Sequence, residues 1–285
     1  MSKLKIAVQK SGRLHDDSMT ILKEIGISVD NGKDQLKASA RNFPLEVFYL
    51  RNGDIPQYLR DGVVDAAIIG ENVLVEKGND LAIVEYLGFS KCRVSIAVPK
   101  SSKAKSIKDL AGKRIATSYP NTVNSFLTQN GIEANLHIIN GSVEIAPNIG
   151  LADGICDIVS SGSTLFKNGL KEIEVLLKSE AVLATSPKIS TENQKRIDTL
   201  QFRLKSVLRG RESKYILLNA PNEKLDTIIK ILPGMNSPTI MPLAKKGWSS
   251  VHSVLDKNDF WTIIDELKAN GAEGILVCPI ENMVL

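Results

Sequence analysis

The chain has 285 residues, of which 43% are hydrophobic and 24% charged, a composition typical of a folded globular protein. This length predicts two or three compact units. A net charge of +4 and an aromatic content of 5%, with no dense basic block, exclude a nucleic-acid-binding module. No stretch is apolar for long enough to span a bilayer, so no membrane partner is expected.

Cysteine and histidine usage indicates a reducing compartment and no metal centre. Cys92, Cys156 and Cys278 are far apart and have aliphatic neighbours, so we interpret them as small buried apolar residues. The three histidines fall in no ligand spacing, so no metal-ligand set is predicted in the protein. The apolar run at the N-terminus is too short for a signal sequence, and we expect a cytoplasmic protein.

Strand and helix signals alternate in the first part of the chain. An apolar run at residues 4–8 predicts a strand, the polar residues 9–13 predict a loop, and helical spacing up to Gly26 predicts a helix. The same order of strand, loop and helix returns between Lys113 and Ile132. This alternation predicts an α/β fold.

An internal repeat predicts two lobes. Residues 61–70 (DGVVDAAIIG) match residues 153–162 (DGICDIVSSG), each interpreted as a helix end, an acidic turn, a buried strand and a glycine at the strand's carboxyl end. Ligands of open α/β sheets bind beyond these carboxyl ends, so each lobe should deliver a loop to a shared cleft. The predicted first lobe comprises residues 1–90 plus 182–209, and the predicted second lobe comprises residues 91–181.

The remaining residues, 210–285, predict a separate domain. A capping box at residues 191–194 begins a long helix before it. Strands and helices then follow in the order βαββαβ, the ferredoxin-like arrangement that ACT-like small-molecule-sensing domains also use. A sensor role rests on analogy of fold alone. The predicted strands are 215–218, 239–242, 251–255 and 274–278, and the predicted helices are 222–232 and 258–269.

The strongest chemical signal is a loop rich in glycine and hydroxyl groups after the predicted strand 155–159. Its backbone N–H groups and hydroxyls could bind a phosphate, although a plain capped turn is an equally good interpretation. Asp153 and Asp157 could accept hydrogen bonds from sugar hydroxyls, or could be solvated acids at a helix end. The members of the loop are Ser160, Ser161, Gly162, Ser163 and Thr164.

Cations at other predicted strand ends could complete a polyanion site. The loop at residues 10–13 contains Lys10, Gly12 and Arg13, and Arg51 and Arg93 also lie near strand ends. Ordinary surface cations are the alternative interpretation. Tyr119 could stack on a base or could anchor a loop. The sequence has no Walker loop and no nucleophile elbow, which fits direct displacement on a substrate that brings its own leaving group.

Ordered matches along nearly the whole chain resemble the long form of ATP phosphoribosyltransferase. The matching stretches include VQKSGRL at 8–14, GKRIATSYP at 112–120, NGSVE at 140–144, the segment 150–164 and RESKY at 211–215. The resemblance implies a two-lobed catalytic unit like a type II periplasmic binding protein, followed by a ferredoxin-like regulatory domain.

The resemblance also implies an activity. The 5-phosphoribosyl group of 5-phosphoribosyl 1-diphosphate is transferred to N1 of ATP in the first step of histidine biosynthesis. Mg²⁺ would arrive with the diphosphate, histidine would inhibit, and the chain would form a homo-oligomer (dimer and hexamer).

The resemblance assigns roles to the candidate residues. Catalytic cations facing the phosphates would be Lys10, Arg13 and Arg51. Phosphoribosyl diphosphate would contact Asp153, Asp157 and Ser160, Ser161, Gly162, Ser163 and Thr164. ATP would contact Gly12, Cys92, Arg93 and Tyr119. Histidine would contact Ser237, Thr239, Ala272 and Gly274.

Two other classes of protein remain as alternatives. A solute-binding protein would share the two-lobe pattern, but the missing export signal and the added βαββαβ domain argue against it. A ligand-sensing regulator would need a DNA-binding helix pair, which the sequence does not predict.

Overall fold

The computed structural model describes residues 3–30, 35–78, 80–232 and 237–285. The chain divides into two compact units, Met1–Asp198 and Thr199–Leu285. This division falls inside the helix α6 (Thr191–Glu212), upstream of the predicted start of the C-terminal domain at residue 210. Within the described ranges, no helix is both long and apolar enough to cross a membrane.

The first lobe of the N-terminal unit is built on a six-stranded sheet. Its elements are β1 (Leu4–Gln9), α1 (Arg13–Glu24), β2 (Lys37–Ser39), β3 (Leu45–Leu50), α2 (Ile55–Arg60), β4 (Ala66–Gly70), α3 (Glu71–Lys77), β5 (Ala82–Tyr86) and β11 (Ala181–Thr185). The strand order is β2-β3-β1-β4-β11-β5. Because β1 is parallel to both β3 and β4, the carboxyl ends of these three strands lie at one edge. The four-residue apolar run in β4 is fully buried, as expected for a strand with elements on both faces.

The second lobe is a five-stranded sheet. Its elements are β6 (Cys92–Pro99), β7 (Arg114–Thr117), α4 (Pro120–Gln129), β8 (Asn135–Ile138), β9 (Gly154–Val159), α5 (Ser163–Lys167) and β10 (Leu170–Ser179). The strand order is β10-β6-β9-β7-β8, with β7 parallel to both β8 and β9. The chain enters this sheet after β5 and leaves it between β10 and β11. Val94 and Ala97, which are three residues apart in β6 and therefore point to opposite faces of the sheet, belong to separate apolar clusters.

The internal repeat reproduces a common lobe plan, but its predicted alignment is wrong by four residues. The Lys5 N–H donates to Asp65 at 2.8 Å, and the Arg114 N–H donates to Asp153 at 3.0 Å. Each aspartate directly precedes a strand that runs parallel to the donor's strand. Asp153 therefore corresponds to Asp65 and not to Asp61. The helix expected before Asp153 is also wrong, because a short 3₁₀ turn at Val143–Ile145 and further turns stand there.

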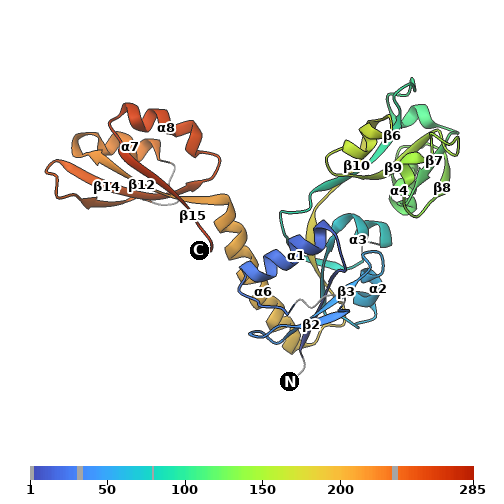
Figure 1. The fold of residues 1–285 in the computed structure, drawn as a ribbon, viewed down its shortest axis with the longest axis horizontal. Coiled ribbons are helices and arrows are strands. Elements are labelled where there is room, and N and C mark those ends of the chain that lie inside the picture. The colour runs from blue at the N-terminus through green and yellow to red at the C-terminus, as the bar shows by residue number, and fades with distance from the viewer. Residues whose placement is uncertain (1–2, 31–34, 79, 233–236) are drawn as a thin grey trace. The chain divides into compact units, whose positions relative to one another are not determined.

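The C-terminal unit confirms the predicted βαββαβ order. Its elements after α6 are β12 (Ser213–Pro221), α7 (Leu225–Ile231), β13 (Thr239–Pro242), β14 (Trp248–Asp256), α8 (Phe260–Ala269) and β15 (Glu273–Pro279). The strand order is β13-β14-β12-β15, and α7 and α8 cover the same face of this sheet (Figure 1). Ile216, Leu218 and Val251 form the core beneath the helices. The opposite face carries Cys278, which is exposed, so the expectation that all three cysteines are buried is wrong.

Candidate functional site

Several hydrogen bonds join the carboxyl edges of the two lobe sheets, and one of them links Asn72 to Tyr119. Asn72 lies two residues after β4, and Tyr119 lies two residues after β7. The Asn72 Nδ2 atom donates to the Tyr119 hydroxyl at 3.0 Å. Since loops at the carboxyl ends of strands form the binding sites of α/β sheets, the loops of both lobes border one inter-lobe region.

The loop between β1 and α1 brings three predicted cations to the edge of the first lobe. The Lys10 N–H donates to the carbonyl of Leu50 at 2.8 Å, which places Lys10 beside Arg51 at the end of β3. Arg13 begins α1, and its guanidinium lies 3.8 Å from the Asp17 carboxylate. All three cationic side chains are exposed, and among the described residues Lys10 and Arg51 have no ion-pair partner. They are free to bind an anion.

The predicted phosphate loop, residues 160–164, connects β9 to α5 in the second lobe. Gly162 directly precedes α5 and has a φ of 79°, a left-handed conformation in which a residue with a side chain would be strained. The Ser161 hydroxyl contacts the Ser163 hydroxyl at 3.0 Å, while Ser160 and Thr164 are exposed. The structure thus gathers all five predicted members in one exposed turn with several donors.

Arg93 holds this loop from the neighbouring strand β6. Its guanidinium donates to both carboxylate oxygens of Glu172, at 2.7 and 2.6 Å, and its third nitrogen donates to the Ser160 carbonyl at 3.2 Å. The carboxylate fixes the fork geometry, so the remaining donor is aimed at the loop backbone. Arg93 therefore supports the phosphate loop directly, a contact that its predicted ATP role did not include.

Asp157 lies near the carboxyl end of β9, the strand that leads into the phosphate loop. Its carboxylate accepts the Ile158 N–H at 2.8 Å and approaches the Ser118 hydroxyl at 3.5 Å. Burial raises the pKa of Asp157; the Ile158 hydrogen bond opposes this shift, and the charge of Glu144 adds to it. A half-buried carboxylate with spare acceptor capacity is available to a hydroxylated ligand.

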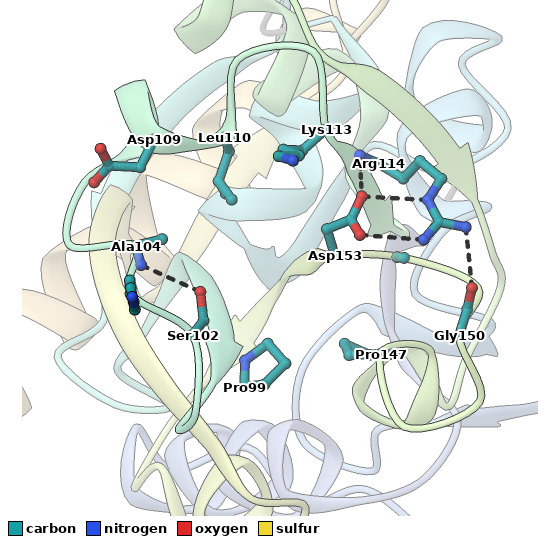
Figure 2. A pocket seen from close by; sticks show the side chains of 12 residues that line it. Pro99, Ser102, Ala104, Asp109, Leu110, Lys113, Arg114, Pro147, Gly150 and Asp153 are labelled. Atoms are coloured by element: carbon teal, nitrogen blue, oxygen red, sulfur yellow. Dashed lines mark hydrogen bonds and ion pairs between the residues drawn. The ribbon is translucent and has the colours of Figure 1, made fainter.

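Asp153, predicted to act with Asp157, lies at the opposite end of β9. Figure 2 shows its carboxylate against the Arg114 guanidinium, at 3.1 and 3.2 Å, with a further Arg114 nitrogen on the Gly150 carbonyl. A six-residue strand spans about 20 Å, so Asp153 is not brought to the phosphate loop. It borders a separate pocket of about 580 Å³ that also includes Ser102 and Lys113.

Of the remaining predicted ATP contacts, Cys92 and Tyr119 are half-buried and Gly12 is exposed. Burial raises the pKa of Tyr119 to about 12, and its ring packs against the apolar core of the second lobe. The half-buried thiol of Cys92 has a pKa raised by burial, and it lies with Arg93 in a pocket of about 570 Å³ that Tyr86 also lines. Gly12 stands exposed before α1 with a φ of 89°. Tyr119 is placed as an anchor between the lobes rather than as a free platform.

The predicted histidine contacts lie on two edges of the C-terminal sheet. Thr239 is exposed in β13, with Ser237 two residues before it, whereas Ala272 and Gly274 lie at the start of β15. Because β14 and β12 separate these edge strands, the two groups are about 14 Å apart within one chain. One chain does not bring the four residues together.

Sequence reasoning missed several polar residues that link the lobes. Asn72, Glu76 and Ser179 are buried and make hydrogen bonds to residues more than 40 positions away. The available signal was the spacing of Asn72 and Glu76, one turn apart in the otherwise apolar run NVLVE.

The described part of the chain contains no group of three or more His, Cys, Asp or Glu residues that could hold a metal ion.

Comparison with known proteins gives matches over both units. The family model described as ATP phosphoribosyltransferase (HisG) matches residues 51–206, and the model for the HisG C-terminal domain matches residues 210–282. A curated ATP phosphoribosyltransferase from Cytophaga hutchinsonii is 55% identical over 281 residues, 99% of this chain and 98% of the relative. One from Phocaeicola vulgatus is 52% identical over 282 residues, 99% of this chain and 100% of the relative.

Solved structures agree with the fold. The ATP phosphoribosyl transferase (HisG:HisZ) complex from Thermotoga maritima aligns with a TM-score of 0.60 and 30% identity, covering 71% of this chain and 98% of that chain. A periplasmic sulfonate-binding protein from Methylobacillus flagellatus aligns with a TM-score of 0.51 and 18% identity, over 81% of this chain and 72% of its own, which shows a shared lobe fold only. The chain therefore belongs to the ATP phosphoribosyltransferase family, the transferases of the first step of histidine biosynthesis, in the long form that includes the C-terminal domain.

Proposed function

We propose that the chain transfers the 5-phosphoribosyl group of 5-phosphoribosyl 1-diphosphate to N1 of ATP, releasing diphosphate. The observation that carries this proposal is the pair of donor-rich loops, one from each lobe, that border one inter-lobe region. The loop after β1 presents Lys10 and Arg13, and the loop after β9 presents Gly162 and its hydroxyl neighbours. Two polyanionic substrates need two such loops.

The phosphoribosyl end fits the second lobe. Backbone N–H groups and hydroxyls of residues 160–164 would bind the 5′-phosphate, as donor-rich concave turns do. Asp157 and Ser118, which lie on adjacent strand ends, would accept and donate hydrogen bonds to ribose hydroxyls. Arg93 would act through the loop that it holds. Asp153 has no place in this assignment because Arg114 occupies its carboxylate at the far end of β9.

The first lobe offers the cations that the negatively charged leaving group needs. Lys10, Arg13 and Arg51 are exposed at one edge, and we propose that they stabilise the leaving diphosphate and the ATP phosphates. A preorganised donor of this kind typically contributes about 10²–10³-fold to kcat.

The reaction needs no side-chain nucleophile. The lone pair of adenine N1 forms a bond to the anomeric carbon while the bond from that carbon to the diphosphate oxygen breaks and diphosphate leaves with the electron pair. The ribosyl carbon is oxocarbenium-like between these events. Residues of both lobes therefore serve to align the two substrates and to stabilise charge.

We further propose that Mg²⁺ arrives with the diphosphate substrate, where it would neutralise phosphate charge. Within the described residues the candidate ligands near the loops do not form a set of three, so this metal is assigned to the substrate and no step is routed through it.

A substrate comparison tests the site of attack. ATP and 1-methyl-ATP should both bind, but only ATP should yield a phosphoribosyl adduct, because the methyl group removes the N1 lone pair. Mass spectrometry of the products with 5-phosphoribosyl 1-diphosphate and Mg²⁺ makes the measurement. An adduct formed from 1-methyl-ATP at the same rate would refute attack by N1.

The C-terminal unit is proposed to bind histidine as a feedback inhibitor between two copies of the chain. Ser237 and Thr239 lie on one edge of the sheet, while Ala272 and Gly274 lie on the other, so one ligand can touch both groups only across copies in an oligomer. We also propose that the protein is cytoplasmic, because the three cysteines in the described part of the chain are unpaired, as is usual in a reducing compartment.

A further inference from the structure

Helix α3 of the first lobe carries two buried polar side chains that bind the second lobe. Asn72 and Glu76 are one turn apart and only 3% and 6% exposed. Their partners in the second lobe include Tyr119, Thr122 and Ser179. We call these five residues the inter-lobe latch.

The Glu76 carboxylate caps the first turn of α4. Its oxygens accept the Asn121 N–H at 3.0 Å, the Thr122 N–H at 2.9 Å and the Thr122 hydroxyl at 2.8 Å. The Asn121 amide also donates to the Glu76 carbonyl at 2.9 Å. The first N–H groups of a helix have no partner within the helix and attract negative charge. A carboxylate of the first lobe therefore accepts hydrogen bonds from the N–H groups that begin a helix of the second lobe.

Asn72 makes the other hydrogen bonds of the latch, to Ser179 and Tyr119. Its N–H donates to the Ser179 hydroxyl at 2.9 Å, the same hydroxyl donates to its Oδ1 at 3.1 Å, and its Nδ2 donates to Tyr119. The side chain folds back over Gly70, where an added Cβ would lie 2.4 Å from the Asn72 Oδ1 atom. Gly70 leaves the space that this conformation needs.

Swinging the lobes apart would break the contacts of Glu76 with the first turn of α4 and of Asn72 with Tyr119. A buried carboxylate and the helix donors that it satisfies would lose their partners, which is strongly unfavourable. Two-lobed binding proteins close around their ligands by hinge motion. The latch instead ties the two lobes to each other through hydrogen bonds between the chain's own residues.

We propose that the inter-lobe latch sets the distance between the two substrates, with Asn72 and Glu76 as positioning residues. The latch fixes the turn between β7 and α4, and this turn carries Ser118 toward Asp157. The proposal rests on the proposed function, in which each lobe holds one reacting partner. A misplacement of about 1 Å lowers a rate by about 100-fold, so alignment is sensitive to the lobe angle.

Inter-lobe distance tests the latch without any activity measurement. Spin labels at Lys23→Cys on α1 and Gln129→Cys on α4, both exposed positions, report one distance in a background with Cys92 and Cys278 replaced by serine. We expect a narrow distribution that inorganic diphosphate does not shift, and a broadened or shifted one in Glu76→Gln. A distribution that is broad without ligand, or identical in Glu76→Gln, would overturn the proposal.

Steady-state kinetics tests the positioning role. Glu76→Gln turns one acceptor into a donor that faces N–H groups, so kcat should fall about tenfold or more while both KM values stay within about threefold. The matched control is Asp109→Asn, because Asp109 accepts the Lys105 N–H, the Ser106 N–H and the Ser106 hydroxyl entirely within the second lobe. The control should keep kcat within about twofold.

Gly70→Ala is the second variant if Glu76→Gln fails to fold, because it displaces the Asn72 amide and leaves the carboxylate in place. It should also lower kcat and change the inter-lobe distance. An unchanged kcat in both folded variants, or a rise in one KM alone, would overturn the positioning role. A wild-type chain without transferase activity would refute the proposed function, while the spin-label distances would still decide whether the latch fixes the lobes.

Discussion

Asp153 and Asp157 stand four residues apart at the two ends of β9, and their surroundings have opposite electrostatic effects. The hydrogen bond from Arg114 holds the pKa of Asp153 below its ordinary value, whereas burial raises the pKa of Asp157. The ionised Asp153 therefore adds stability above the ordinary carboxyl pKa and loses it as pH falls through the lowered pKa. The ionised Asp157 lowers stability as pH rises through its raised pKa.

This contrast predicts a trade-off at Asp157. Asp157→Asn removes a charge that is unfavourable when buried, so the melting temperature at neutral pH should be unchanged or higher. Activity should fall about tenfold or more, because hydrogen bonds from ribose hydroxyls to a charged acceptor contribute about 1.5–3 kcal/mol. Thermal unfolding and steady-state kinetics on the same sample make the measurement.

Asp153→Asn is the matched comparison on the same strand. It should lower the melting temperature slightly, since half-exposed ion pairs contribute about 0–1 kcal/mol, and leave the KM for phosphoribosyl diphosphate unchanged. Loss of activity in Asp153→Asn with full activity in Asp157→Asn would reverse the two assignments.

At the scale of elements, the phosphate loop depends on one left-handed residue. Gly162→Val places a β-branched side chain at a φ of 79°, so the turn should rearrange and the KM for phosphoribosyl diphosphate should rise about tenfold or more. Gly169→Val is the control, because Gly169 has a φ of 69° with open space around it and lies after α5. Equal KM values in the two folded variants would show that the loop does not bind the phosphate.

Local patterns predicted most strands and helices but not how the lobes match each other. Apolar runs and stop signals placed β1, α1 and the C-terminal βαββαβ order within a few residues, because burial of one face fixes such periodicities. The repeat was aligned on Asp61, since an Asp-Gly pair begins both segments, whereas the hydrogen bond to the neighbouring strand belongs to Asp65. Only the paired strand reveals which acid has that role.

The candidate site was predictable in part for the same reason. The two donor-rich loops follow recognisable strands, so their positions at carboxyl edges came from local sequence. The partners of Arg93 and Glu76 are tens of residues away along the chain and depend on tertiary packing. Such contacts leave no periodic signal in the sequence. The inter-lobe latch therefore could not be predicted from local sequence patterns.

At the scale of the whole molecule, histidine inhibition should depend on assembly. The candidate contacts Thr239 and Gly274 lie on opposite edge strands, so a shared ligand needs a second copy. Dilution of the enzyme to concentrations at which the oligomer dissociates should weaken inhibition, because histidine binding is linked to association of the copies. At assembling concentrations, saturating histidine should change the apparent affinity for a substrate by about 5–150-fold. Equal inhibition of a chain that sedimentation velocity shows to be monomeric would place the sensor within one copy.

The most direct test of the central claim is release of diphosphate coupled to formation of phosphoribosyl-ATP. The full chain is mixed with ATP, 5-phosphoribosyl 1-diphosphate and Mg²⁺, and each substrate is omitted in turn. Because both loops must be occupied for one displacement, we predict one diphosphate for each phosphoribosyl-ATP and neither product when a substrate is missing. Diphosphate release at the full rate without ATP, or no phosphoribosyl-ATP with all components present, would contradict the account.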